Sequence, residues 1–61
     1  MPIVTVKLLE GRSDDQKRQL VEKVTDAVVE TTNASPEKVS VIIEEMSPSH
    51  FGTGGKRVSD S

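Results

Sequence analysis

The sequence predicts an α/β fold, namely a single βαβ unit with parallel strands and a short C-terminal hairpin, assembled into an oligomer. Two segments rich in β-branched residues, 2–9 and 39–46, flank one amphipathic segment, 14–32. With 61 residues the chain is expected to form one domain, 1–61, that buries little surface by itself. The absence of cysteine and the single histidine exclude disulfides and a closed zinc site, so oligomerisation remains as the stabilising device.

The first strand is expected over residues 2–9, where Pro2 stands at a first position that loses no earlier ladder hydrogen bond. Alternation assigns the side chains to two faces. One face carries Val4, Val6 and Leu8, and the other carries Ile3, Thr5, Lys7 and Leu9. Both faces are largely apolar, as in sheets that are covered on both sides.

A helix is expected over residues 14–32, because Ser13 and Gln16 form a capping-box pattern at its start. Asn33 is the predicted helix stop, and Pro36 prevents the helix from resuming. A core-facing stripe of roughly 120° is expected to hold Leu20, Val21, Val24, Ala27, Val28 and Thr31. The solvated face is expected to hold Arg18, Glu22, Asp26 and Glu30.

The second strand is expected over residues 39–46 and is again apolar on both sides. Strand, helix and strand in this order predict parallel pairing with a right-handed crossover. One helix covers only one face of such a sheet, so the other face is expected to meet another subunit. The glycine spacing after Met46 favours a loop and then a short hairpin.

Composition excludes several classes of protein. The longest apolar runs are too short to cross a membrane, and the start of the chain lacks the pattern of a signal peptide. A net charge of −2 and a single aromatic residue argue against nucleic-acid binding. The chain is therefore expected to be a soluble, cytoplasmic protein without a nucleic-acid or membrane partner.

Most polar motifs in the sequence favour structural roles. His50 has no second ligand at metal-binding spacing, so no metal site is predicted. Glu44 and Glu45 are adjacent on a strand and point to opposite faces, which excludes an acid/base pair. The glycine-rich segment 52–56 lacks a following helix to bind phosphate, and a hairpin is the better interpretation.

Pro2 and Arg12 are the two candidates for a catalytic or binding role. Removal of the initiator Met1 would leave Pro2 with a secondary amine, and an amine in a dry pocket beside a cation can act as a general base. Arg12 offers a planar fork that binds carboxylates. Their structural alternatives are the start of a strand and a surface arginine. The two lie about 25 Å apart along an extended strand, so a shared site requires two subunits.

Several segments resemble the 4-oxalocrotonate tautomerase (2-hydroxymuconate tautomerase) family of the tautomerase superfamily. They are Pro2-Ile3 at the start, 9–17 at the first turn, 42–46 in the second strand, and His50-Phe51-Gly52 with Gly54-Gly55 in the tail. The similarity covers almost the whole chain, so residues 1–61 are expected to be a single tautomerase domain.

The resemblance implies an isomerase that needs no cofactor and assembles as a homohexamer, a trimer of dimers. Its substrate would be a small enol or keto acid of the 2-hydroxymuconate type. By position, Pro2 matches the general base and Arg12 matches the arginine that binds a substrate carboxylate. Leu9 matches the residue whose backbone amide contacts substrate, and Phe51 matches the aromatic wall of the pocket, with a hydrophobic plug under the hairpin as its alternative.

One departure concerns the second strand, where the family enzyme acting on the dicarboxylate has another arginine and this chain has Ser40. Lys38 is two residues earlier and is expected on the same face. Because this second arginine is missing, we expect only modest activity on the dicarboxylate 2-hydroxymuconate. The alternatives are another proline-dependent activity, such as phenylpyruvate tautomerase or haloacrylate hydratase, and a non-catalytic oligomeric βαβ protein.

Overall fold

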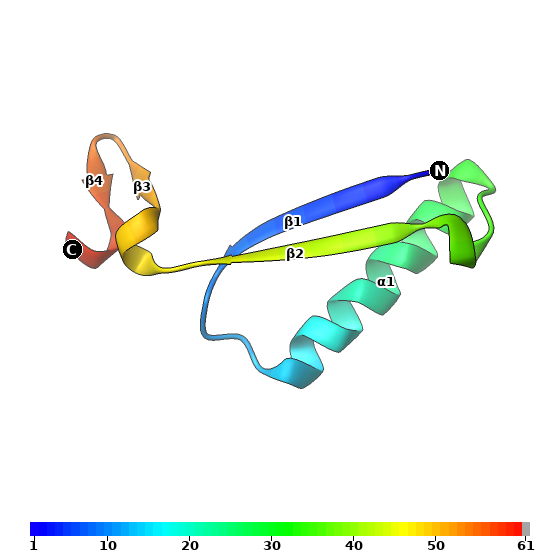
Figure 1. Ribbon diagram of the computed structural model, residues 1–61, viewed down its shortest axis with the longest axis horizontal. Helices are drawn as coiled ribbons and strands as arrows, with labels where there is room; N and C mark the ends of the chain where they lie inside the picture. Colours follow the sequence, from blue (N-terminus) through cyan, green and yellow to red (C-terminus); the bar gives the residue numbers. More distant parts are fainter. Residues whose placement is uncertain (61) are drawn as a thin grey trace.

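A computed structural model describes residues 1–60 and places a βαβ unit before a small hairpin (Figure 1). The helix and strands are β1 (Ile3–Leu9), α1 (Asp14–Thr32), β2 (Ser40–Met46), β3 (Gly52–Thr53) and β4 (Lys56–Arg57). Short 3-10 helices, which the sequence did not predict, follow α1, β2 and β4 at Pro36–Lys38, Pro48–His50 and Val58–Asp60. The predicted order of elements is confirmed.

Strands β1 and β2 form a two-stranded parallel sheet, as predicted. Ile3 lies opposite Ser40 at one end of the sheet, and Leu9 lies opposite Met46 at the other. Strand β2 begins one residue later than predicted. The reason is that Val39 still closes the preceding 3-10 helix, with its N–H donating to the Pro36 carbonyl at 3.1 Å.

Helix α1 has the two ends that the sequence predicts. The Ser13 hydroxyl accepts from the Gln16 N–H at 3.1 Å, and the Gln16 side chain accepts from the Ser13 N–H at 3.0 Å. Asn33 adopts a left-handed conformation with φ of 62° and donates to the Val29 carbonyl at 3.1 Å. Local hydrogen bonds therefore define both helix ends.

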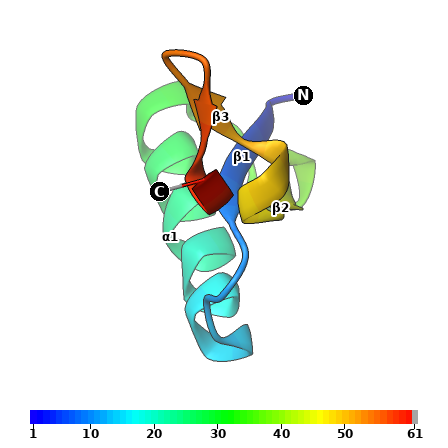
Figure 2. The same ribbon diagram turned by 90° about the vertical axis from the view of Figure 1, so that its left-hand side faces the viewer.

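Helix α1 covers one side of the two strands (Figures 1 and 2). The predicted stripe is partly wrong: Val21, Ala27 and Thr31 are exposed, whereas Thr25 and Val29 are half-buried. The physical reason is that the two-stranded sheet is narrower than the helix: the strands lie about 5 Å apart, and a helix is about 10 Å across. Residues at the margins of the stripe therefore extend past the sheet. The four predicted solvent-facing charges, Arg18, Glu22, Asp26 and Glu30, are exposed.

The opposite face of the sheet remains open. Ile3 is 61% exposed and Ile42 is 47% exposed, and no hydrophobic residue in the described part of the chain is fully buried. The radius of gyration is 14.5 Å, against about 10 Å for a globular domain of this length. The isolated chain thus lacks the closed core that a stable small domain needs.

The hairpin of β3 and β4 stands apart from the βαβ unit, beyond the carboxyl end of β2 (Figure 1). Gly54 and Gly55 form its turn with positive φ values of 65° and 85°, a conformation that glycine adopts without steric cost. None of the helices in residues 1–60 is long and apolar enough to span a bilayer.

Candidate active site

Pro2 and Ser40 meet at the amino ends of the two parallel strands. The Ser40 N–H donates to the Pro2 carbonyl at 3.0 Å, and both residues are half-buried. Met1 precedes them and is 90% exposed. Lys38 does not continue the face of Ser40, as the alternation predicted, because it belongs to the 3-10 helix Pro36–Lys38 and lies outside the strand.

Arg12 lies at the other end of β1, in the turn that leads into α1. It lines a cavity of about 270 Å³. The other lining residues come from β1 and from the first turns of α1, and they are Leu8, Gln16, Lys17 and Leu20. Gly11, with φ of 118°, makes the bend that precedes Arg12. The capping box at Ser13 then fixes the direction of the helix that forms one wall.

Arg12 differs from the other arginines in its charge environment. Arg18 pairs with Asp14 at 3.0 Å and with Asp15 at 3.4 Å, and Arg57 pairs with Asp60 at 3.0 Å. Arg12 forms no ion pair or side-chain hydrogen bond within residues 1–60. Its guanidinium is therefore available to an external carboxylate.

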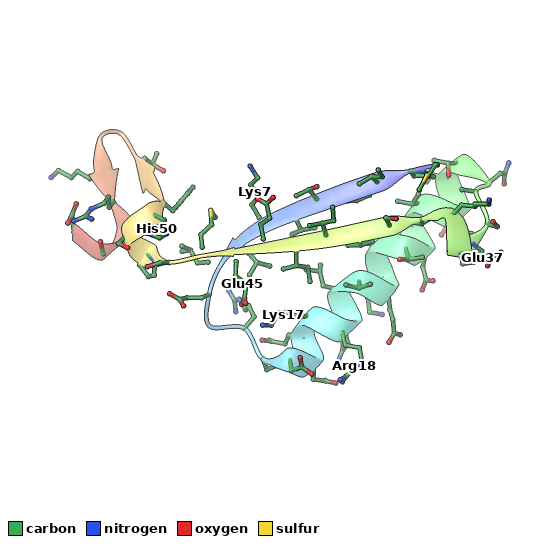
Figure 3. The ribbon with its side chains drawn as sticks, in the orientation of Figure 1. Lys7, Lys17, Arg18, Glu37, Glu45 and His50 are labelled. Atoms are coloured by element: carbon green, nitrogen blue, oxygen red, sulfur yellow. The ribbon has the colours of Figure 1, made fainter. Side chains whose placement is uncertain are left out.

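Lys17 is the second cation at the cavity. Its ammonium lies 3.1 Å from Glu45 of β2, and Figure 3 shows the two side chains on the α1 side of the sheet. Glu44 points to the open face, where it pairs with Lys7 at 3.9 Å. The expectation that the two glutamates point to opposite faces is confirmed, and each has a lysine as its partner.

The structure does not bring Pro2 and Arg12 together within one chain. Figure 1 places the start of β1 and the turn before α1 at opposite ends of the sheet. Seven residues of β1 separate them, which is about 23 Å at roughly 3.3 Å per residue. A small substrate that contacts both residues must therefore bind between two copies of the chain.

Leu9 ends β1 and has a backbone N–H that faces away from β2. The Ser40 N–H donates to the Pro2 carbonyl, and the Glu10 N–H donates to the Met46 carbonyl at 2.9 Å. Alternate residues of a strand bond to the same neighbour in a parallel ladder, so the even-numbered residues of β1 bond to β2. The Leu9 N–H consequently points to the outer edge of β1, where another molecule can reach it.

Phe51 follows the second 3-10 helix and leads into the hairpin. It is 41% exposed, and its carbonyl accepts from the Val58 N–H at 2.9 Å. The hydrogen bond closes the base of the hairpin, and the residue stays partly accessible to another molecule. Leu9, Arg12 and Phe51 thus lie towards the carboxyl ends of β1 and β2, whereas Pro2 and Ser40 lie at the amino ends (Figure 1).

The remaining polar groups of the tail have local roles. His50 is exposed, and the described residues contain no group of three His, Cys, Asp or Glu that could bind a metal. Segment 52–56 forms the predicted hairpin, which excludes its use as a phosphate-binding loop before a helix. The hydrogen bond from the Arg57 side chain lowers the pKa of Asp60 below its ordinary value.

Sequence reasoning missed four of the residues that line the Arg12 cavity, namely Leu8, Gln16, Lys17 and Leu20. A signal was available, because residues 16, 17 and 20 share one side of a helix that starts directly after Arg12. This spacing indicates a shared cavity only once it is known that the turn folds α1 back under β1, the strand that carries Leu8.

Comparisons with known proteins are consistent along the whole chain. Residues 2–61 match the family model described as Tautomerase enzyme. The 2-hydroxymuconate tautomerase of Bacillus subtilis is 67% identical over 60 residues, which are 98% of this chain and 97% of the relative. The solved structure of YwhB, a homologue of 4-oxalocrotonate tautomerase, is 65% identical with a TM-score of 0.96 and covers 98% of both chains. A heterohexamer 4-oxalocrotonate tautomerase from Chloroflexus aurantiacus is 30% identical with a TM-score of 0.93, covering 98% of this chain and 97% of that one.

Proposed function

The chain belongs to the tautomerase family and is an isomerase, and from this premise we propose that it interconverts enol and keto acids of the 2-hydroxymuconate type. The proposed enzyme needs no cofactor, and residues 1–61 act as one catalytic domain. The observation that carries the proposal is the unpaired guanidinium of Arg12 at a small cavity with apolar walls. A cation in such a place suits a small organic anion.

Pro2 is the proposed general base, once Met1 has been removed. Its neutral amine takes the proton of the substrate's 2-hydroxyl, and the electron pair moves through the conjugated system. The resulting ammonium then returns a proton to a distant carbon, which gives the 2-oxo acid and restores the amine. Substrate and product are isomers, so the step needs no further reactant.

Arg12 is proposed to bind a substrate carboxylate and to draw electron density towards it. The Leu9 N–H offers a backbone donor at the outer edge of β1, and the Phe51 ring forms an apolar wall. Three features support these roles. Arg12 forms no ion pair within residues 1–60, the Leu9 N–H points away from β2, and Phe51 is 41% exposed.

The proposed active site lies between subunits of a homo-oligomer, as a homohexamer built from three dimers. Its support is the distance between Pro2 and Arg12, together with the open sheet face and the hairpin that stands apart. The Chloroflexus relative is described as a heterohexamer. A partner that covers Ile3 and Ile42 would remove from water the apolar surface that a single chain leaves exposed.

Ser40 favours a second candidate substrate class. It lies beside Pro2 and is neutral, so at this position the chain offers no charged side chain to a second carboxylate. Enols with a single carboxylate, such as phenylenolpyruvate, are therefore proposed to be processed with efficiency comparable to the diacid.

The deciding experiment measures ketonisation of 2-hydroxymuconate by the wild-type protein and by Pro2→Ala, with intact mass confirming that Met1 is absent from both. We expect clear wild-type turnover and a loss of at least about a hundredfold in the variant, as for removal of a general base. Equal rates for the two proteins would contradict the role of Pro2. No wild-type turnover above buffer would contradict the proposed substrate and direct the assay to enols with one carboxylate.

A further inference from the structure

All three polar side chains that line the Arg12 cavity carry hydrogen-bond donors, and none carries a negative charge. Arg12 and Lys17 each carry a positive charge, and they never accept hydrogen bonds. The Gln16 side-chain oxygen accepts from the Ser13 N–H at 3.0 Å, and its NH2 group has donors for a ligand. Leu8 and Leu20 supply the apolar walls. Two cations and an amide donor beside apolar walls suit a carboxylate that carries a hydrocarbon chain.

Lys17 lines this cavity, and its ammonium forms an ion pair with one carboxylate. Glu45 lies 3.1 Å away, with exposed fractions of 29% for the Lys17 side chain and 37% for that of Glu45. The other ion pairs within residues 1–60 have side chains at least 46% exposed. The Lys17–Glu45 pair is therefore the best shielded from solvent, and it is the one that links α1 to β2.

We propose that Lys17 contributes to substrate affinity by binding the same carboxylate as Arg12, and that Glu45 limits how strongly it does so. The inference rests on the proposed function of the site. Glu45 orients the Lys17 ammonium towards the cavity but cancels much of its charge. When a substrate carboxylate enters, Lys17 shares its hydrogen bonds between that carboxylate and Glu45.

This arrangement predicts an uneven distribution of charge along the substrate site. Two cations bind one carboxylate at the Arg12 end, while Ser40 leaves the Pro2 end without a charged side chain of its own. The preferred ligand is a small acid with one carboxylate at one end and a neutral group at the other. An added second carboxylate is expected to contribute little to binding.

The two members of the ion pair should have opposite effects when they are replaced. Lys17→Gln removes a cation from the cavity, so KM is expected to rise about tenfold, as for the loss of a charge-assisted hydrogen bond. Glu45→Gln removes the competing anion, so KM is expected to fall about threefold. A purely structural ion pair would make both variants less stable and would leave KM unchanged or move it in the same direction.

The experiment measures kcat and KM for 2-hydroxymuconate and for 2-hydroxy-2,4-pentadienoate, a dienol with one carboxylate. We expect kcat within about threefold of the wild type in each variant, equal changes in KM for both substrates, and recovery by Lys17→Arg. Arg18→Gln and Asp15→Asn are matched controls, because they change the same charges on α1 outside the cavity. Shifts of equal sign for Lys17→Gln and Glu45→Gln would overturn the proposal.

A binding measurement keeps this inference separate from the catalytic one. Adipate is a dicarboxylate that cannot tautomerise, and its binding can be titrated by calorimetry whether or not the protein turns over any substrate. Weaker binding by Lys17→Gln and tighter binding by Glu45→Gln support the inference even if the Pro2→Ala test fails. Unchanged affinity in both variants, or no binding by the wild type, would overturn it.

Discussion

Arg12 and Arg18 illustrate how differently one residue type can act within seven positions of sequence. Arg18 lies one turn into α1 and is held by Asp14 and Asp15, each at 3.4 Å or less. Arg12 lies before the helix, out of reach of those carboxylates, and remains unpaired within the described residues. The position relative to the helix start, more than the residue type, thus decides which arginine can bind a ligand.

Replacing Arg12 tests this difference directly. Arg12→Gln is expected to lower kcat/KM for 2-hydroxymuconate by about a hundredfold or more, because an electrostatic contact to the substrate is lost. Steady-state kinetics measure the change, and thermal unfolding should show no loss of stability because Arg12 has no partner in the fold. Arg18→Gln is the control, with kcat/KM within about twofold of the wild type. Equal losses in the two variants would contradict a specific role for Arg12.

Ser40 carries the prediction about substrate preference. Ser40→Arg is expected to raise kcat/KM for the diacid by about tenfold, because it adds a cation beside Pro2 for the second carboxylate. Activity on 2-hydroxy-2,4-pentadienoate should stay within about twofold. Ser35→Arg adds the same charge at an exposed position outside the strand and serves as the control. An equal rise for both substrates would show that the added charge acts without recognising the second carboxylate.

At the scale of elements, helix α1 is the part whose ends are determined locally. Its capping box uses residues only three positions apart, and its end uses the left-handed Asn33. These hydrogen bonds do not depend on distant parts of the chain. The side that faces the sheet does depend on them, since the half-burial of Thr25 and Val29 requires that other elements pack against the helix.

The capping box gives a stability prediction. Ser13→Ala removes the acceptor for the Gln16 N–H and is expected to lower the free energy of unfolding by about 1 kcal/mol per chain. Urea denaturation at one fixed protein concentration measures it, because oligomers gain stability with concentration. Ser35→Ala is the matched control, since the Ser35 side chain makes no capping hydrogen bond. A loss of equal size in the control would show that the effect does not come from the cap.

At the scale of the whole molecule, the open face of the sheet has the largest consequence. Within residues 1–60 no hydrophobic side chain is fully buried, and the chain is only 13 Å thick along its shortest axis. This face carries the Lys7–Glu44 pair, and it also exposes the apolar residues Ile42 and Ile3. Folding and assembly are therefore expected to occur together.

Ile42→Asp tests whether the open face of the sheet is used in assembly. A buried charge in the proposed subunit interface is expected to dissociate the oligomer into smaller species. It is also expected to abolish turnover, because the proposed site lies between two subunits. Size exclusion with light scattering measures the mass. Glu22→Gln, on the solvated face of α1, should change neither mass nor activity. A variant that keeps its full mass would contradict the use of this face in assembly.

The sequence by itself determined the order of elements, both ends of α1, the parallel pairing and the hairpin, since these follow from local hydrogen bonds, periodicity and chain connectivity. It also singled out Pro2 and Arg12 through their chemistry, and Leu9 and Phe51 through the family resemblance; the roles of all four remain predictions. Only the tertiary structure decided that Leu8, Gln16, Lys17 and Leu20 surround Arg12 and that Glu45 holds Lys17. Residues of different elements become neighbours only when the strand and the helix pack. Their spacing along the sequence does not give their distance in space.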